Sequence, residues 1–264
     1  MKNLFQTKLR NLKEEGYVVI KPENKHFSKL VEEACAFVYH KVKNNEFSNP
    51  GFLNMNNKPR QLVNQHLHKG SIYEKLIKSK EIREFSKALF PNERILIDHS
   101  KVSIKFKSDK MDWEPHQDAG YGEREGMTIA IFLEDCDSDN GTIEIYPRSH
   151  KLGIIPHKRS EDENQAFIPK EKLEGMNSCP IEAKKGDILA FDLLSVHRSG
   201  NTIKDSLRAI FILEIRPYQR FNMSDQTFLP FMIVGKLNFV EYTVSYMKFL
   251  LFGMKRYIKH QINI

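Results

Sequence analysis

Residues 128–146, TIAIFLEDCDSDNGTIEIY, contain the pattern on which the fold prediction rests. Two short apolar and β-branched runs, 128–133 and 142–146, flank an acidic segment that ends in Asp-Asn-Gly, a sequence typical of tight turns. Further runs of this kind lie at residues 95–106, 187–191 and 207–215, and a Lys-Gly-Asp turn leads into the run at 187–191. Short strands with turns between them predict an antiparallel sandwich or jelly roll.

Helical patterns frame this β-rich part of the chain. Apolar residues recur at helical spacing over 4–15 and 27–43, and a short strand is predicted between them at 17–20. A further helix is predicted over 72–90. The stretch 44–60 is rich in Asn, Pro and Gly, which predicts a long loop. We therefore expect a mainly β protein whose N-terminal helices buttress the sheets from outside.

The length of 264 residues suits one domain, with its core strands between about 95 and 217. Residues 228–264 are apolar and aromatic, with Lys and Arg toward the end, and predict a C-terminal helical segment. This segment can pack on the sheet, form a dimer contact, cover a pocket as a lid, or make a peripheral membrane contact. The sequence leaves these four placements open, and it carries no feature that defines the oligomeric state.

Composition and charge favour an ordinary globular protein. Hydrophobic residues make up 40% of the chain and charged residues 28%, which provides ample material for a buried core. The net charge of +7 favours anionic ligands in general. Lys and Arg are scattered from end to end, without the dense basic block of a nucleic-acid tail. Nucleic acid is therefore not an expected partner.

The cysteines and the N-terminus predict a cytoplasmic protein. The three cysteines lie far apart and include no Cys-x-x-Cys pair, so neither a disulfide framework nor a zinc knuckle is indicated. The first residues, MKNLFQTKLRNLKEEG, become charged before an apolar run of signal-peptide length forms. No stretch approaches the roughly 18 uncharged apolar residues of a membrane span.

Three residues predict a catalytic metal site: His116, Asp118 and His197. The first two are two residues apart, so on an extended strand both side chains project from the same face. His197 follows 81 residues later (197 − 116), a separation that a sheet folding back on itself can close. Two imidazoles and one carboxylate form the facial triad of non-haem Fe(II) oxygenases, which leaves positions for cosubstrate, O2 or water.

Two residues near His197 suit a carboxylate ligand. Arg208 lies 11 residues beyond His197 (208 − 197) on the next predicted strand. Its guanidinium can grip a carboxylate through two charge-assisted hydrogen bonds, and Ser199 can add a hydroxyl donor. The cosubstrate 2-oxoglutarate requires such an anchor.

With these residues in place, the sequence resembles the phytanoyl-CoA dioxygenase family of Fe(II)/2-oxoglutarate-dependent oxygenases. The matching motifs, in a consistent order over most of residues 1–217, are GYVVI at 16–20, HQD at 116–118, NGTIEIYPRSHK at 140–151, HRSGN at 197–201, and Arg208. The resemblance implies a double-stranded β-helix core of the cupin type. It also implies iron held by His116, Asp118 and His197, 2-oxoglutarate held by Arg208 and Ser199, O2 as a reactant, and ascorbate as a candidate reductant.

The resemblance extends to further residues of the site. Family members often direct a Lys or polar residue at the cosubstrate from the strand before the His-x-Asp motif, and Lys105 is the match here, although Lys101 and Lys107 share its strand face. A carboxylate at 118, where related halogenases have Gly or Ala, implies hydroxylation. Trp113 and Arg148 are the candidates for substrate contact, and Arg148 would suit an anionic substrate.

The predicted function is hydroxylation of a small or carrier-linked molecule, with release of succinate and CO2. Desaturation or ring closure can follow from the same chemistry, and the substrate itself is not defined by these motifs. One alternative is a non-catalytic jelly-roll binding module that retains the motifs by descent. Another is an oxygenase directed at a peptide or nucleic acid. Nucleic-acid demethylases of this superfamily carry two arginines six apart after the distal His, whereas Arg208 and Arg216 are eight apart (216 − 208).

Overall fold

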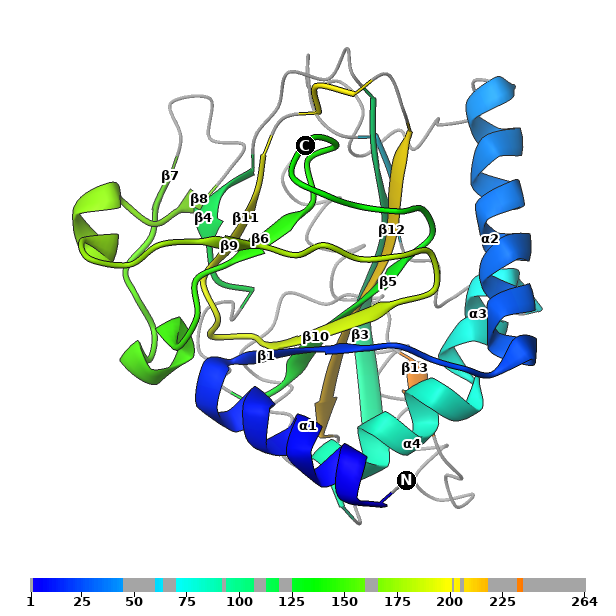
Figure 1. Ribbon diagram of the computed structural model, residues 1–264, viewed down its shortest axis with the longest axis horizontal. Helices are drawn as coiled ribbons and strands as arrows, with labels where there is room; N and C mark the ends of the chain where they lie inside the picture. The colour runs from blue at the N-terminus through cyan, green and yellow to red at the C-terminus, as the bar shows by residue number, and fades with distance from the viewer. Residues whose placement is uncertain are drawn as a thin grey trace, which may run out of the picture.

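The computed structural model describes residues 2–44, 60–63, 70–91, 94–106, 113–118, 125–159, 166–200, 202–204, 207–217 and 232–234. Within these residues, two antiparallel sheets form the centre of the molecule, and helices lie beside the larger one (Figure 1). A two-stranded ribbon, β7 (Lys158–Arg159) with β8 (Ala166–Phe167), extends from the smaller sheet. Short 3-10 helices span Ser149–Leu152 and Lys170–Leu173.

The larger sheet has the strand order β1-β10-β5-β12-β3-β13, and β2 also pairs with β3. Its strands are β1 (Tyr17–Ile20), β2 (Arg60–Val63), β3 (Ile95–Lys105), β5 (Met127–Phe132), β10 (Ile188–Asp192), β12 (Arg208–Pro217) and β13 (Met232–Val234). The smaller sheet has the order β4-β11-β6-β9. Its strands are β4 (Trp113–His116), β6 (Ile143–Ile145), β9 (Cys179–Pro180) and β11 (His197–Ser199).

The path of the chain between the sheets defines the fold. From β3 to β6 the strands alternate between the larger and the smaller sheet, and they alternate again from β9 to β12. Alternation of antiparallel strands between two facing sheets is the jelly-roll arrangement. The predicted double-stranded β-helix is therefore confirmed.

The larger sheet is apolar on both faces, because it is covered on both sides. Successive residues of a strand point to opposite faces. In β5, Ile129 and Ile131 belong to the core cluster that includes the helices, whereas Ala130 and Phe132 pack with residues of the smaller sheet. All six residues of β5 are buried. This explains why the sequence shows continuous apolar runs in place of a strict apolar–polar alternation.

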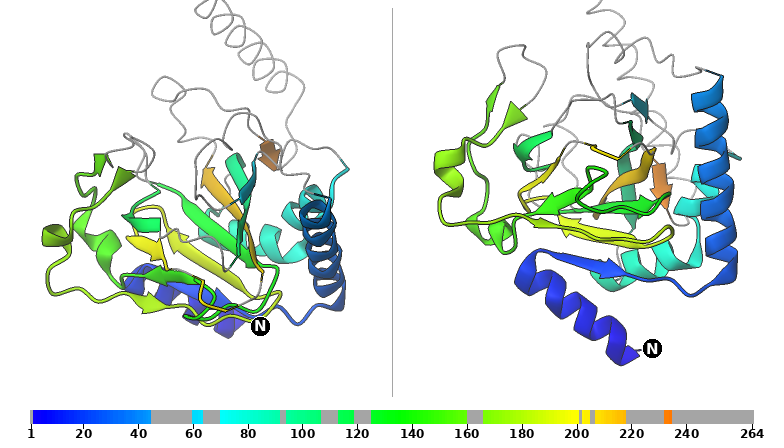
Figure 2. Two further views of the ribbon diagram at one scale, coloured as in Figure 1. Left: turned by 90° about the horizontal axis from the view of Figure 1, so that it is seen from above. Right: turned by 45° about the horizontal axis from the view of Figure 1, so that its top comes forward.

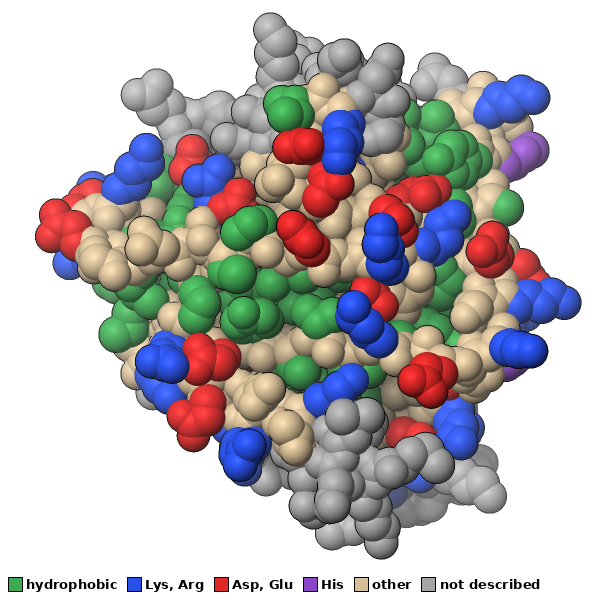
Figure 3. Space-filling view, in the orientation of Figure 1, with side chains coloured by type: hydrophobic (Ala, Val, Ile, Leu, Met, Phe, Trp, Pro, Cys, Tyr) green, Lys and Arg blue, Asp and Glu red, His purple; other side chains and the backbone are tan. Residues whose placement is uncertain are grey.

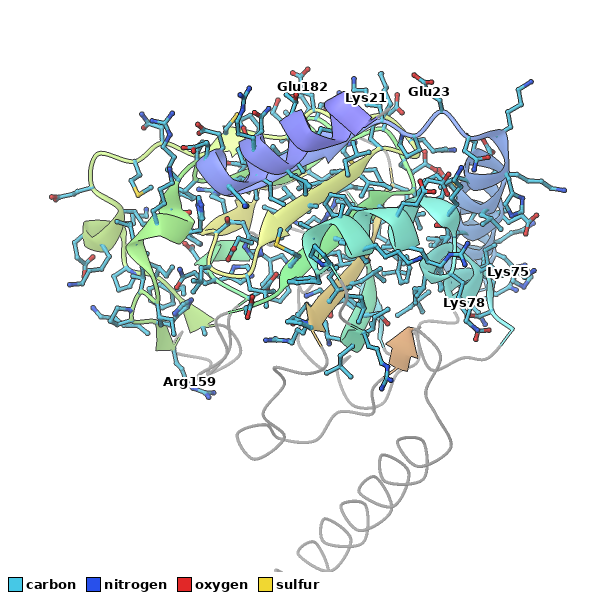
Figure 4. All side chains as sticks on the ribbon, turned by 90° about the horizontal axis from the view of Figure 1, so that it is seen from below. Lys21, Glu23, Lys75, Lys78, Arg159 and Glu182 are labelled. Atoms are coloured by element: carbon cyan, nitrogen blue, oxygen red, sulfur yellow. The ribbon has the colours of Figure 1, made fainter. Side chains whose placement is uncertain are left out.

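In the part of the chain that the structure describes, four helices flank the larger sheet: α1 (Lys2–Glu15), α2 (Lys25–Lys43), α3 (Ile72–Ile77) and α4 (Lys80–Leu89). Helices α2, α3 and α4 gather on one side of it, as the two views of Figure 2 show. The ring of Tyr73 on α3 lies 4.8 Å from the ring of Phe211 on β12, centroid to centroid. In Figure 4, Lys75 of α3 and Lys78, which follows the helix, lie at the outer edge of the molecule, away from the sheets.

The single helix predicted over residues 72–90 is two helices, which is a correction to the sequence analysis. Helix α3 ends at Ile77, and Ser79 then caps α4: its Oγ accepts a hydrogen bond from the Ile82 N–H at 3.4 Å. A serine hydroxyl offers the backbone a local alternative to helix continuation, so serine favours caps over helix interiors. The apolar spacing across residues 72–90 did not reveal this break.

Several predictions concern residues outside the described part. The loop predicted at 44–60 lies almost entirely there, and so does the C-terminal segment 228–264, apart from the strand β13. The extent of the domain therefore stays a prediction. Among the described helices, none is both long enough and apolar enough to span a membrane. On the face drawn in Figure 3, Lys and Arg side chains are interspersed with Asp and Glu.

Candidate metal centre and cosubstrate pocket

The structure brings His116, Asp118 and His197 together between β4 and β11. These strands pair antiparallel with His197 directly opposite His116, which closes the 81-residue separation. Strand β4 ends at His116, so Asp118 stands just beyond the strand, in a bend. One ligand atom from each of the three residues lies within 4.8 Å of the others. The Nε2 atoms of His116 and His197 lie 3.9 and 3.6 Å from the Asp118 carboxylate oxygens.

Each of the three side chains is oriented by a neighbouring polar group. The Nδ1 atoms of His116 and His197 lie 2.7 and 3.1 Å from the carbonyl oxygens of Glu114 and Ser195. A carbonyl only accepts, so Nδ1 carries the proton in each ring and Nε2 keeps its lone pair toward the centre. The Thr128 hydroxyl donates to Asp118 Oδ2 at 2.7 Å. The arrangement is that of metal ligands with their supporting hydrogen bonds.

The electrostatics of the group suit a cation. Burial lowers the pKa of His116 to about 3, and the charge of His197 acts in the same direction, so the His116 imidazole is neutral at physiological pH. Burial acts to raise the pKa of Asp118, but the neighbouring imidazoles, the charge of Lys101 and the Thr128 hydroxyl hold it below its usual range. A carboxylate beside neutral imidazole is the donor set that non-haem iron prefers.

A pocket opens beside these three residues, and its walls come from both sheets. The lining residues are Lys101, Ser103, Trp113, His116, Asp118, Thr128, Ile143, Phe191, His197, Arg198, Ser199, Arg208, Ile212 and Glu214. On β12 the lining positions are alternate residues, which point to one face of the strand. The predicted metal, cosubstrate and substrate residues thus share one pocket, with the exceptions of Lys105 and Arg148.

Arg208 is a buried cation in this pocket, with 1% of its surface exposed. One guanidinium nitrogen donates to Ser103 Oγ at 3.4 Å, while Nε has no hydrogen-bond partner among the described residues. Burial lowers the pKa of Arg208 to about 10. A buried guanidinium that lines a pocket and keeps an orphaned donor is the expected setting for a carboxylate that arrives as a ligand.

Lys105 has a position different from the predicted one. It is fully buried and is not among the lining residues of the pocket. Its Nζ lies 2.8 Å from Ser199 Oγ, 3.3 Å from the Ser199 carbonyl and 2.7 Å from the Gly200 carbonyl. Because Lys105 occupies an acceptor position of the Ser199 hydroxyl, that hydroxyl keeps its own proton to donate into the pocket. Lys105 therefore orients the Ser199 hydroxyl through a hydrogen bond and does not itself line the pocket.

The two candidate substrate residues lie apart. Trp113 lines the pocket, and it pairs with Ser199 across β4 and β11. Arg148 lies in a turn with a left-handed backbone (φ 66°), and its side chain is 68% exposed. Its guanidinium makes paired hydrogen bonds with the Glu15 carboxylate, with a shortest distance of 2.8 Å. The turn thus directs Arg148 to the end of α1 and away from the pocket lining.

Other lining residues were not singled out from the sequence. Thr128 supports Asp118, and its signal was only an isolated polar residue at the start of an apolar strand. Lys101, Arg198 and Glu214 place charges on the pocket wall. Arg198 lies within the HRSGN motif and Lys101 shares the strand face of Lys105, but only the strand register shows that these side chains reach the pocket wall.

Comparison with known proteins agrees with this geometry. The family model described as phytanoyl-CoA dioxygenase (PhyH) matches residues 12–209. L-proline trans-4-hydroxylase of Streptomyces griseoviridis is 24% identical over 137 residues, which cover 43% of this chain and 51% of that protein. The chain therefore spans about half the length of this curated relative.

Solved structures share the fold at low sequence identity. The non-heme alpha ketoglutarate dependent epimerase SnoN from nogalamycin biosynthesis superposes with a TM-score of 0.65 at 15% identity, covering 82% of this chain and 84% of SnoN. EctD from S. alaskensis with bound Fe gives a TM-score of 0.63 at 14% identity, covering 85% and 79%. The family model spans most of the chain in the order that the motifs predicted, and the chain belongs to the phytanoyl-CoA dioxygenase family.

Proposed function

We propose that this protein is an Fe(II)- and 2-oxoglutarate-dependent dioxygenase that hydroxylates a small molecule. The observation that carries the proposal is the joint presence, in one pocket, of a His-Asp-His cluster and a buried, incompletely partnered arginine. A non-catalytic binding module has no need to keep both features, because each is costly to bury without its ligand.

His116, Asp118 and His197 would hold the iron. Their three ligand atoms converge on one point, and both Nε2 lone pairs and one carboxylate face it. The Nδ1 hydrogen bonds and the Thr128 hydroxyl fix these orientations before a metal arrives. Three protein ligands on one side leave the other positions of the ion open to the cosubstrate and O2.

Arg208 and Ser199 would hold the far carboxylate of 2-oxoglutarate. The orphaned Nε of Arg208 supplies a donor, and Lys105 leaves the Ser199 proton available as another. When bound, iron and 2-oxoglutarate supply the oxidising power: 2-oxoglutarate, O2 and a C–H bond give succinate, CO2 and an alcohol. The protein's own contribution is to orient these groups and exclude side reactions.

The proposed substrate is a small or carrier-linked molecule. The curated relative is named as a hydroxylase of L-proline, a small molecule, although the match covers only half of that protein. We propose hydroxylation of a small or carrier-linked molecule, with ascorbate as the reductant that keeps iron in its ferrous state. Asp118 supports hydroxylation, since it fills the ligand position that a halide would need.

The test is release of CO2 from labelled 2-oxoglutarate by purified protein with Fe(II) and ascorbate, followed by incubation with a metabolite extract. Mass spectrometry should detect a product that has gained one oxygen atom in step with succinate. His197→Ala should abolish both signals, whereas His26→Ala, an exposed histidine on α2, should leave them unchanged. Wild-type protein that binds neither metal nor 2-oxoglutarate would contradict the proposal.

A further inference from the structure

Lys101 is a pocket residue to which the proposed reaction assigns no role. It projects from β3 into the pocket, and its Nζ lies over the ring of Trp113, 5.5 Å from the centroid. Within the residues that the structure describes, this cation–π contact is its only partner, since its ammonium makes no hydrogen bond or ion pair with them. Its charge acts on the pKa of both His116 and Asp118, which places it close to the metal ligands.

Two other charged side chains on the pocket wall, Arg198 and Glu214, have counterions. Arg198 Nε lies 3.6 Å from the Glu144 carboxylate, and Arg216 donates to the Glu214 carboxylate at 3.3 Å. Each of these pairs is neutral as a unit. The buried Lys105 is not on the pocket wall, and its Nζ contacts oxygen atoms of Ser199 and Gly200.

The charge of the loaded pocket can now be summed, and this step rests on the proposed function. A ferrous ion brings two positive charges and 2-oxoglutarate two negative ones. Asp118 and Arg208 add one of each sign, so the metal, its cosubstrate and their charged anchors together are neutral. Lys101 then remains as a positive charge on the pocket wall that is left over from this sum and can pair with an anion.

We propose that Lys101 and Trp113 form an anion subsite that receives a carboxylate of the primary substrate. Trp113 offers an apolar face for the carbon skeleton beside that carboxylate, while Lys101 supplies the charge. The subsite is separate from the cosubstrate anchor: Arg208 lies opposite Lys105 in the sheet, and Lys101 lies four residues away, opposite Ile212. Four residues of extended strand span roughly 13 Å.

The chain contains a single tryptophan, so the intrinsic fluorescence of Trp113 reports on this subsite directly. The protein is loaded with Zn(II), which cannot turn over, and with saturating 2-oxoglutarate. Quenching by iodide, an anion, is then compared with quenching by neutral acrylamide. In Lys101→Met the Stern–Volmer quenching constant for iodide should fall about two- to fourfold. This is the effect expected in screened water from one unit charge 5.5 Å from the Trp113 ring. The quenching constant for acrylamide should stay unchanged. Lys101→Arg should restore iodide quenching.

A pair of shape-matched probes tests carboxylate recognition in the same loaded protein. Cyclopentanecarboxylate should perturb Trp113 fluorescence with an affinity about tenfold higher than cyclopentanecarboxamide, since a charge-assisted hydrogen bond is lost in the amide. Lys101→Met should remove this preference and Lys101→Arg should keep it. Equal affinities in the wild type, including no binding of either probe, overturn the proposal, and so does an unchanged iodide constant in Lys101→Met.

The 2-oxoglutarate affinity separates this inference from the function on which it rests. Calorimetric titration of the Zn(II) protein should give dissociation constants for wild type and Lys101→Met that agree within about threefold, as expected when only a distant screened charge changes. A loss of 100-fold would make Lys101 a cosubstrate anchor and overturn the substrate subsite. Failure of the wild type to bind 2-oxoglutarate would overturn the proposed function itself.

Discussion

Replacing Arg208 by Met should stabilise the ligand-free protein while destroying its affinity for 2-oxoglutarate. Burial lowers the pKa of Arg208 from 12.5 to about 10. For a basic group, a lowered pKa means that the folded state disfavours the charged form. At neutral pH the guanidinium is charged in both folded and unfolded chains, so the penalty is fully present. Since a tenfold change in proton affinity corresponds to about 1.4 kcal/mol, the penalty is about 3 kcal/mol.

Met follows the path of the arginine stem, so Arg208→Met keeps most of the packing and loses one long hydrogen bond to Ser103. A hydrogen bond from a charged donor contributes about 1.5–3 kcal/mol net, and this one, at 3.4 Å, belongs at the low end of that range. The free energy of unfolding of the metal-free protein should therefore rise by about 1–3 kcal/mol, read from urea denaturation followed by circular dichroism. The affinity for 2-oxoglutarate with Zn(II), measured by calorimetry, should fall at least about 100-fold, as expected when a buried charge loses its partner.

Arg216→Met is the matched control. Arg216 lies on the same strand and is 3% exposed, but it already has a carboxylate partner in Glu214. Its removal should destabilise the protein by about 1–3 kcal/mol, because a paired buried charge is lost and the other is left behind. The reasoning is refuted if Arg208→Met proves as destabilising as Arg216→Met, or if it binds 2-oxoglutarate with wild-type affinity.

Three further substitutions test the remaining contacts. Lys105→Met should lower the free energy of unfolding by about 2–4 kcal/mol in urea denaturation, because three buried acceptors lose their donor, and should weaken 2-oxoglutarate binding through Ser199. Burial raises the pKa of Asp192, a penalty on its charged form that is present at neutral pH and vanishes below the ordinary pKa of 3.8. Asp192→Asn should thus be more stable than wild type at pH 7 and equally stable at low pH. Arg148→Ala should leave the KM and kcat of the oxygenase reaction within about twofold, since the residue lies outside the pocket lining.

The metal triad could be predicted from the sequence because its spacing and neighbours are motif-like. The same holds for Arg208, which follows His197 by 11 residues (208 − 197) at the start of the next strand along the chain. Lys105 and Lys101 show where this reasoning ends. Both lie on the same face of β3, and only the register with β12 reveals that one stands opposite Arg208 and the other opposite Ile212. A shift of four residues along a strand does not alter the side that a residue faces, so periodicity alone cannot choose between Lys101 and Lys105.

The position of Arg148 and the break in the helix predicted over residues 72–90 were not visible in the sequence for a different reason, which is local backbone geometry. The motif around Arg148 matches the family, but its left-handed backbone aims the side chain at Glu15, 133 residues earlier in the chain. A contact between residues so far apart in the sequence cannot be inferred from the spacing of residues within either segment. Ser79 likewise separates α3 from α4, although the helical spacing of apolar residues continues from one helix into the other. Strand existence and overall fold depend on many residues together, so they survive such single-residue effects.

The charged and polar side chains of the pocket are held in place by the protein alone. The free-energy penalty of burying the Arg208 charge is offset by the packing of the rest of the fold. Among the described residues Arg208 has no carboxylate partner, and the rings of His116 and His197 are held by backbone carbonyls with Nε2 free to bind a metal. A scaffold whose larger sheet is apolar on both faces can tolerate such a local penalty. The penalty is relieved only by a carboxylate bound at Arg208. Under the proposed function, part of the binding energy of 2-oxoglutarate would come from pairing this buried charge with a carboxylate.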